Sequence, residues 1–238
     1  MHLSPRVRAH LLALCGLWAV AFGAILIVGL DVIAARDEAD SFWYLRRRTI
    51  SHHALGLQRW VFDSAVVLLA AGSLAVLAAL LAAGIARKRS AAAYALAAWC
   101  AGLLLVALFQ KHDWSVGPSL GGYVHWAGTL LAFLSLPAAA ILLARPWLWH
   151  GPWRVTAWSS LVLGVTALLC FLPVVFAIAV HLTIGTSWWQ VVPLGLVERV
   201  LAIVEVVAVL VMGRWARSAA CSPAIPLGSV TVDRGISR

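Results

Sequence analysis

Charged side chains are scarce in this sequence. Only 11% of its 238 residues are Asp, Glu, Lys or Arg, whereas 63% are hydrophobic. Soluble domains carry about 25% charged residues, and a chain this apolar could not cover a water-exposed surface with polar groups. A lipid bilayer removes that requirement, so the composition argues against a soluble protein and indicates an integral membrane protein.

Cysteine is also scarce, and no two cysteines have the spacing of metal ligands. Three of the four lie inside apolar runs, and the fourth lies near the C-terminus; they are Cys15, Cys100, Cys170 and Cys221. We therefore expect free thiols that pack as small hydrophobic groups, with no disulfide framework.

The net charge of +9 comes from basic residues in short clusters between long apolar runs. This distribution argues against a nucleic-acid partner, because it is explained by topology control and by contact with anionic lipid headgroups. Membrane lipids are the expected partners, and the sequence indicates neither a protein partner nor a particular cofactor.

Six runs are long and apolar enough to cross a bilayer, which takes about 20 residues. They cover approximately residues 11–33, 61–85, 91–110, 123–144, 155–180 and 194–213. An all-α bundle of about six transmembrane helices is therefore expected over residues 1–215. Pro137 and Pro173 should kink the fourth and fifth helices. Residues 216–238 are predicted to form a disordered cytoplasmic tail, because they are rich in Ser, Pro and Gly.

Basic residues in the connections predict the orientation. Eleven lie on the side of the termini and six on the other side, so the positive-inside rule places both termini on the cytoplasmic side of the inner (plasma) membrane. Arg46, Arg47 and Arg48 run against this pattern, because the rule puts their loop outside.

Ionisable residues gather at the expected outer ends of the helices, where they could enclose a polar pocket. A short loop makes the third and fourth helices antiparallel neighbours, so we expect Asp113 to hydrogen-bond to His125, either directly or through one water. Glu198 and Glu205 are seven residues apart and share one face of the sixth helix. Ser51, Asp113, His125 and Glu198 are expected to line one cavity open to the outer side, which Arg199 and His181 complete. Alternatively, each of these residues is an interfacial or helix-packing residue.

Three short stretches resemble the bacterial membrane proteins grouped as domain of unknown function 998. They are Thr49–Ser51 with Leu55 and Gly56, Phe109–Asp113 through His125 to Phe133, and Gly195–Arg199. The resemblance covers about residues 9–215 and implies a membrane fold but no activity. It also implies that certain polar residues recur together in the family, here Ser51, Asp113, His125, Glu198 and Arg199. His52 and His53, where the family more often has an acidic residue, and Gln110, where it has proline, depart from that pattern.

Three functions are compatible with these residues. In a membrane-embedded hydrolase of lipid-like substrates, Ser51 would be the nucleophile, Asp113 the orienting group and His125 the base. However, no nucleophile elbow surrounds Ser51. A zinc site is a variant of this hypothesis, with ligands drawn from His112, Asp113, His125 and His181.

The other two functions are not catalytic. A small proton-linked transporter could relay protons through Glu198, Glu205, His125 and His181, but the sequence has no visible repeat of the kind common in carriers. In a membrane scaffold or accessory protein the polar residues only hold the bundle together. The sequence alone favours the scaffold as the best guess.

Overall fold

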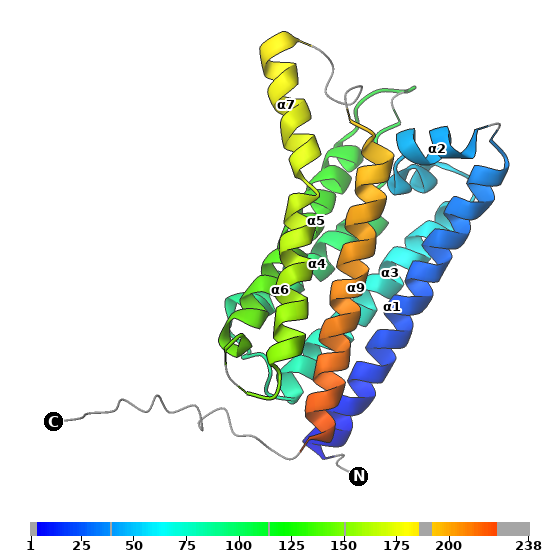
Figure 1. The fold of residues 1–238 in the computed structure, drawn as a ribbon. Helices are drawn as coiled ribbons and strands as arrows, with labels where there is room; N and C mark the ends of the chain where they lie inside the picture. Colours follow the sequence, from blue (N-terminus) through cyan, green and yellow to red (C-terminus); the bar gives the residue numbers. More distant parts are fainter. Residues whose placement is uncertain (1–3, 39, 114, 150, 186–191, 223–238) are drawn as a thin grey trace.

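The computed structural model describes residues 4–38, 40–113, 115–149, 151–185 and 192–222, and their regular structure is helical. Long helices run side by side along one bundle (Figure 1). They are α1 (Pro5–Arg36), α3 (Arg59–Ala82), α4 (Ala91–Leu108), α5 (Leu120–Ala144), α6 (Arg154–Leu169) and α9 (Leu194–Cys221). The shorter elements are α2 (Ser41–Arg47), α7 (Leu172–Ile184) and the 3-10 helices η1 (Ile50–Leu55) and η2 (Arg145–Trp147). The predicted all-α fold is confirmed.

Five helical segments are long and apolar enough to cross a membrane. They are Pro5–Arg36, Arg59–Ala82, Ala91–Leu108, Leu120–Trp147 and Arg154–Ile184. The 28-residue α9 is less apolar, because three charged residues fall in its first half, but it runs along the bundle beside the others (Figure 1). The structure is therefore that of a polytopic helical membrane protein with about five to six spans.

Serine side chains begin three of the helices. Ser4, Ser90 and Ser119 precede α1, α4 and α5, and each hydroxyl accepts a hydrogen bond from a backbone N–H in the first turn. Such capping satisfies one of the donors that a helix leaves unpaired at its start.

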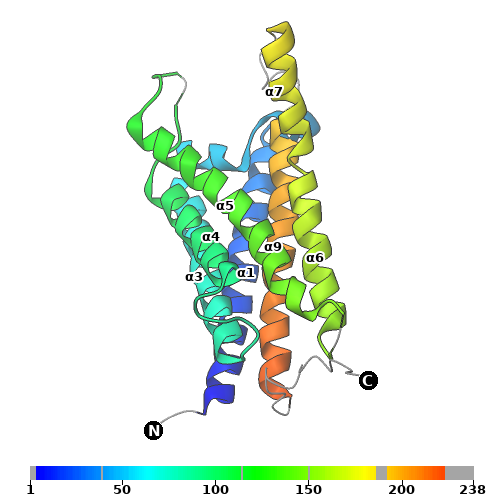
Figure 2. The same ribbon diagram turned by 90° about the vertical axis from the view of Figure 1, so that its left-hand side faces the viewer.

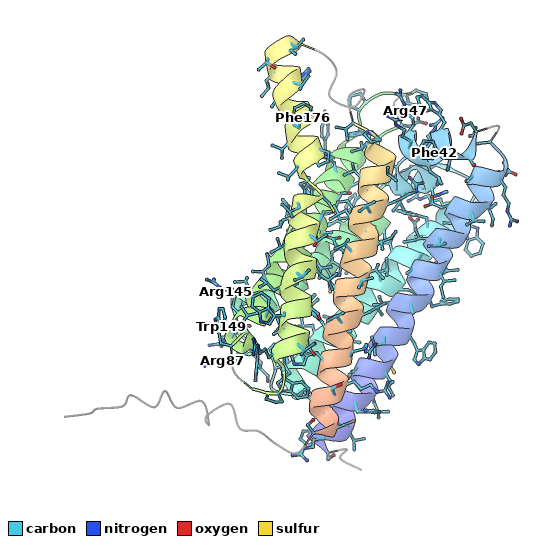
Figure 3. The ribbon with its side chains drawn as sticks, viewed as in Figure 1. Phe42, Arg47, Arg87, Arg145, Trp149 and Phe176 are labelled. Carbon is cyan, nitrogen blue, oxygen red and sulfur yellow. The ribbon has the colours of Figure 1, made fainter. Side chains whose placement is uncertain are left out.

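The fifth predicted helix is two helices in the structure. α6 ends at Leu169 and α7 begins at Leu172, so Pro173 lies in the first turn of a new helix, where its missing N–H breaks no helical bond. α7 projects past the end of the bundle in both views (Figures 1 and 2). Its apolar side chains are exposed there, Phe176 among them (Figure 3). Pro137, in contrast, lies inside the uninterrupted α5.

Glycines allow the closest approaches between neighbouring helices. A Cβ atom added at Gly16 of α1 would lie 2.7 Å from the carbonyl oxygen of Gly72 in α3. A Cβ atom at Gly102 of α4 would lie equally close to the carbonyl oxygen of Gly128 in α5. Small residues at such crossings bring helix backbones into direct contact, which is typical of membrane bundles.

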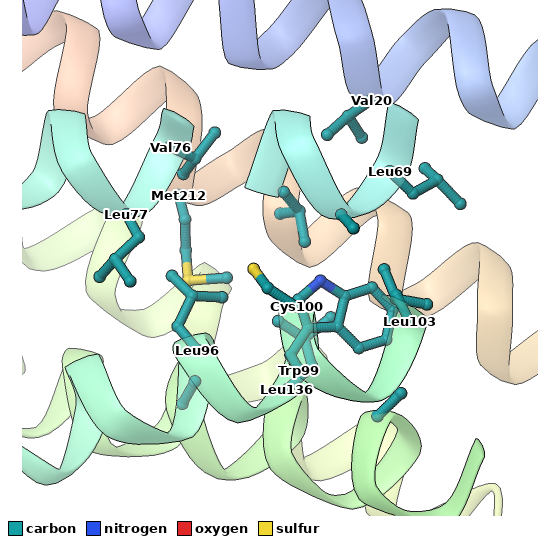
Figure 4. Packing of buried hydrophobic residues seen from close by; sticks show 14 of the residues in the cluster. Val20, Leu69, Val76, Leu77, Leu96, Trp99, Cys100, Leu103, Leu136 and Met212 are labelled. Atoms are coloured by element: carbon teal, nitrogen blue, oxygen red, sulfur yellow. The ribbon is translucent and has the colours of Figure 1, made fainter. Parts of the chain in front are cut away.

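The core lies where α3, α4, α5 and α9 meet (Figure 4). Trp99 is buried there among Leu96, Leu136 and Met212, and its indole N–H donates to the hydroxyl of Ser73 at 2.9 Å. This bond satisfies a polar group that would otherwise be costly at membrane depth.

The beginning of α1 and the end of α9 lie at the same end of the bundle (Figure 1). Arg87, Arg145 and Trp149 lie toward that end, whereas α2 with Phe42 and Arg47 lies at the opposite end (Figure 3). Helix α9 continues to Cys221, past the predicted domain boundary at residue 215. Most of the predicted tail, residues 223–238, lies outside the described residues.

Candidate functional site

The candidate site is a polar cap in which α2 and η1 lie across the end of the bundle where α9 begins (Figure 1). Asp40 starts α2 by accepting a hydrogen bond from the N–H of Trp43 at 2.9 Å. Gly195, in the first turn of α9, packs directly against the end of α2, because an added Cβ would lie 2.6 Å from the carbonyl oxygen of Leu45. This close approach places the charged residues of α9 beside η1.

Arg199 of α9 and Asp31 of α1 form an ion pair with two hydrogen bonds. Nε of Arg199 donates to Oδ2 of Asp31 at 2.9 Å, and Nη2 donates to Oδ1 at 2.6 Å. Nε2 of His53 in η1 donates to the same Oδ1 at 3.0 Å. All three side chains are largely buried, so the carboxylate is compensated from two sides.

The remaining nitrogen of Arg199 binds backbone carbonyls. Nη1 donates to the oxygens of Leu45 at 2.9 Å, Arg48 at 2.6 Å and Gly195 at 3.0 Å. Two of these carbonyls lie at the end of α2, where a helix leaves acceptors unpaired. One guanidinium therefore connects α1, α2 and α9.

A second cluster surrounds Ser51. Nζ of Lys111, three residues after the end of α4, donates to the hydroxyls of Thr49 at 2.7 Å and Ser51 at 3.2 Å. These two hydroxyls are 3.1 Å apart. Oε2 of Glu198 accepts from the backbone N–H of Ile50 at 2.9 Å. Thus the loop before α3, the segment after α4 and the start of α9 meet at one place.

Burial lowers the pKa of Lys111, and the charge of Arg48 lowers it further, whereas Glu198 acts in the opposite direction. Burial also lowers the pKa of His52, and nearby Arg48 and Lys111 reinforce the effect. Nη1 of Arg48 donates to Nε2 of His52 at 3.3 Å. Near neutral pH, a larger fraction of Lys111 is consequently in the neutral amine form than is the case for an exposed lysine.

The direct Asp113–His125 hydrogen bond predicted above is not formed. Oδ1 of Asp113 accepts from the N–H of Ser115 at 3.0 Å and from its hydroxyl at 2.6 Å, and these bonds lower the pKa of the exposed carboxyl. Nδ1 of His125 donates to the carbonyl oxygens of Phe109 at 2.8 Å and Val106 at 3.1 Å. A direct bond is not formed because the end of α4 offers unpaired carbonyls to the histidine, and a tight turn holds the aspartate.

The structure divides the predicted site residues. Ser51, Glu198 and Arg199 lie at the cap, whereas His125 is buried between α4 and α5. The exposed side chain of His181 lies on the projecting α7. Glu205 is only 1% exposed within the bundle, and among the described residues its carboxyl oxygens have no hydrogen-bond partner. Among the described residues, no hydrogen bond joins the side chains of Glu198, Glu205 and His125 to one another.

The zinc hypothesis finds no support from side-chain positions. Within the described ranges, no three His, Cys, Asp or Glu side chains gather in a way that could hold a metal ion. Nδ1 of His112 accepts from the N–H of Ser119 at 3.0 Å, and its ring packs edge-on against Tyr123. This histidine organises the start of α5.

Sequence reasoning overlooked the roles of Lys111, Thr49 and Asp31. Lys111 follows an apolar helix almost directly, so burial of its amine could have been expected from that position. Asp31 and Arg199 are opposite charges inside separate apolar runs, and ionisable groups in membrane helices commonly pair. That rule could have suggested their contact, although the carbonyl partners of Arg199 depend on how α2 folds back.

These features define a polytopic helical membrane protein with a hydrogen-bonded polar cap at one end of its bundle. The chain belongs to the family described as protein of unknown function (DUF998), which matches residues 19–215. The resemblance inferred from the sequence is thereby confirmed. No curated protein and no solved structure matches the chain.

Proposed function

We propose that this protein is a membrane-embedded hydrolase of lipid-like esters, with Ser51 as the nucleophile and Lys111 as the base. The hydrogen bond of 3.2 Å between the partly buried Lys111 amine and the Ser51 hydroxyl carries this proposal. A general base must lie within about 3.2 Å of the proton that it removes. Lys111 therefore takes the role that the sequence had assigned to His125.

The proposed reaction has four steps. Neutral Lys111 removes the hydroxyl proton as Oγ of Ser51 forms a bond to the ester carbonyl carbon. The bond from that carbon to the alcohol oxygen breaks, and the lysine ammonium returns its proton to the leaving alkoxide. Water then attacks the acyl-serine ester and gives one proton to Lys111. Cleavage of the acyl–Oγ bond returns that proton to the serine oxygen.

Thr49 would position the base. Its hydroxyl accepts from Lys111 at 2.7 Å, which holds the flexible lysine stem beside Ser51. Glu198 lies close enough to act on the lysine charge and can stabilise the ammonium that forms during the reaction. The N–H of Ile50 donates a hydrogen bond to this carboxylate and so holds it against the backbone of η1.

The orientation of the chain supports a site on the outer side of the inner (plasma) membrane. The cap lies at the opposite end of the bundle from Arg87, Arg145, the start of α1 and the end of α9 (Figures 1 and 3). The positive-inside rule assigns the basic end to the cytoplasm. An ester in the outer leaflet could then reach Ser51 from the headgroup level.

Labelling with a fluorophosphonate, which traps activated serines, tests the proposal. The purified full chain should be labelled at Ser51, and Ser51→Ala should abolish the labelling. Lys111→Arg keeps a cation but cannot supply a neutral amine, so the labelling rate should fall by roughly 10²-fold or more. Ser115→Ala, which removes an exposed serine hydroxyl from a loop of the same end, is the matched control and should label normally.

The labelling rate should also rise with pH as Lys111 loses its proton, because only the neutral amine is a base. The midpoint should lie below the usual lysine range, since burial lowers the pKa of Lys111. A properly folded protein that is never labelled at Ser51, or whose labelling is unaffected by Lys111→Arg, would contradict the hydrolase.

A structural scaffold is the second candidate, and the three elements joined by Arg199 favour it. In a scaffold, Lys111 would serve only to hold η1 against the segment after α4. Variants at Ser51 and Lys111 would then alter thermal stability and leave no serine reactivity to lose.

A further inference from the structure

Basic groups outnumber free acidic groups around Ser51. Lys111 reaches its hydroxyl, and the next residue, His52, accepts a hydrogen bond from Arg48. In the described part of the chain, no ion pair joins Arg48 to a carboxylate. The backbone oxygen of Arg48 is held by Arg199 at 2.6 Å, so the point from which this arginine side chain extends is fixed.

The two nearby carboxylates are already engaged. Glu198 accepts from the backbone at Ile50 and interacts with the charge of Lys111. Asp113 accepts two hydrogen bonds from Ser115. Among the described residues, neither of these carboxylates forms an ion pair with Arg48, so its guanidinium is available to an anion beside the candidate nucleophile.

Helix α2 places this charge among interfacial aromatic residues. Phe42 and Trp43 are 65% and 49% exposed, and the guanidinium groups of Arg46 and Arg47 lie 5.7 and 4.6 Å from the Trp43 ring centroid. Exposed aromatic side chains at the end of a membrane bundle favour the headgroup level. An anion that reaches Arg48 would thus arrive at the depth of lipid phosphates.

We infer that the ester cleaved at Ser51 belongs to a phosphate-bearing membrane lipid, and that Arg48 and the ring N–H of His52 bind its phosphate. This inference rests on the hydrolase proposed above for the site. A planar guanidinium matches the geometry of phosphate oxygens. Phosphate binding also explains why three successive arginines occur on the side of the membrane where the positive-inside rule disfavours them.

Protection against fluorophosphonate labelling measures substrate preference. Short-chain phosphatidylglycerol should protect Ser51 at a concentration roughly tenfold below that of diacylglycerol with the same chains, because only the first carries a phosphate that Arg48 can bind. The Arg48→Gln variant should bring the ratio of the two protective concentrations close to one. Arg36→Gln, an equal charge change at an exposed position of the same bundle end, should keep the preference.

Binding measured without catalysis separates this inference from the hydrolase proposal. In Ser51→Ala, phosphatidylglycerol should raise the midpoint of thermal unfolding more than diacylglycerol with the same chains does, and Arg48→Gln should abolish the difference. If binding shows the preference while no serine is labelled, the hydrolase falls and the anion site stands. Equal effects of the two lipids overturn the inference. Inorganic phosphate that is as effective as the lipid at equal concentration would show a site for free anions and overturn the lipid assignment.

Discussion

Replacing Arg199 by Met should destabilise the bundle strongly. The change removes five hydrogen bonds, two of them to the Asp31 carboxylate. It leaves that carboxylate, only 14% exposed, with His53 as its remaining partner. Breaking a buried pair from one side typically costs about 3–5 kcal/mol, because the other charge is left without compensation.

Thermal unfolding in detergent, followed by tryptophan fluorescence, measures the effect. In a chain of this size, about 1 kcal/mol shifts the midpoint by roughly 2–4 °C, so Arg199→Met should lower it by roughly 6–20 °C. The matched control is Arg59→Met. It breaks an ion pair with Asp63 whose partners are 39% and 27% exposed, and such a pair is worth about 0–1 kcal/mol.

A double variant tests the physical reason for the loss. Asp31→Asn with Arg199→Met removes the stranded charge together with its partner, so it should be more stable than the sum of the two single losses predicts. The reasoning is refuted if Arg199→Met shifts the midpoint no more than Arg59→Met does, or if the two single effects simply add.

Two further predictions concern packing and topology. Gly102→Ala should cost about 1–3 kcal/mol, because the new methyl group would lie 2.7 Å from backbone atoms of α5. Gly29→Ala, with open space around it inside α1, should not lower the unfolding midpoint and should raise it slightly, because alanine favours the helix. A reporter that is active only outside the cytoplasm should stay inactive when fused to the C-terminus, and its activity would reverse the proposed orientation.

The membrane helices could be predicted from the sequence because long apolar runs leave few alternatives in a bilayer. The break between α6 and α7 was harder to foresee. A proline can occupy either a kink within a helix or the first turn of a new one, and Pro173 takes the second position. Nothing in the apolar pattern around it distinguishes the two.

The candidate site was predictable only in part, because its contacts depend on the path of the chain between α1 and α3. Ser51 and Glu198 were identified as polar residues at the same end, and the cap brings them into one cluster. The partner of Ser51 depends on where α4 ends. The carbonyls at the end of α4 bind the imidazole of His125. The hydroxyl of Ser51 is contacted by Lys111 instead.

The hydrogen bonds of Arg199 also determine at which stage of synthesis the polar cap can form. Asp31 enters the membrane with the first helix, and its arginine partner follows only after another 167 intervening residues, as their separation of 168 positions implies. Until α9 is inserted, the carboxylate lacks its strongest partner and α2 lacks the guanidinium that binds its final carbonyls. A chain truncated before α9 therefore carries an incomplete cap, and the site around Ser51 can assemble only after α9 has been synthesised.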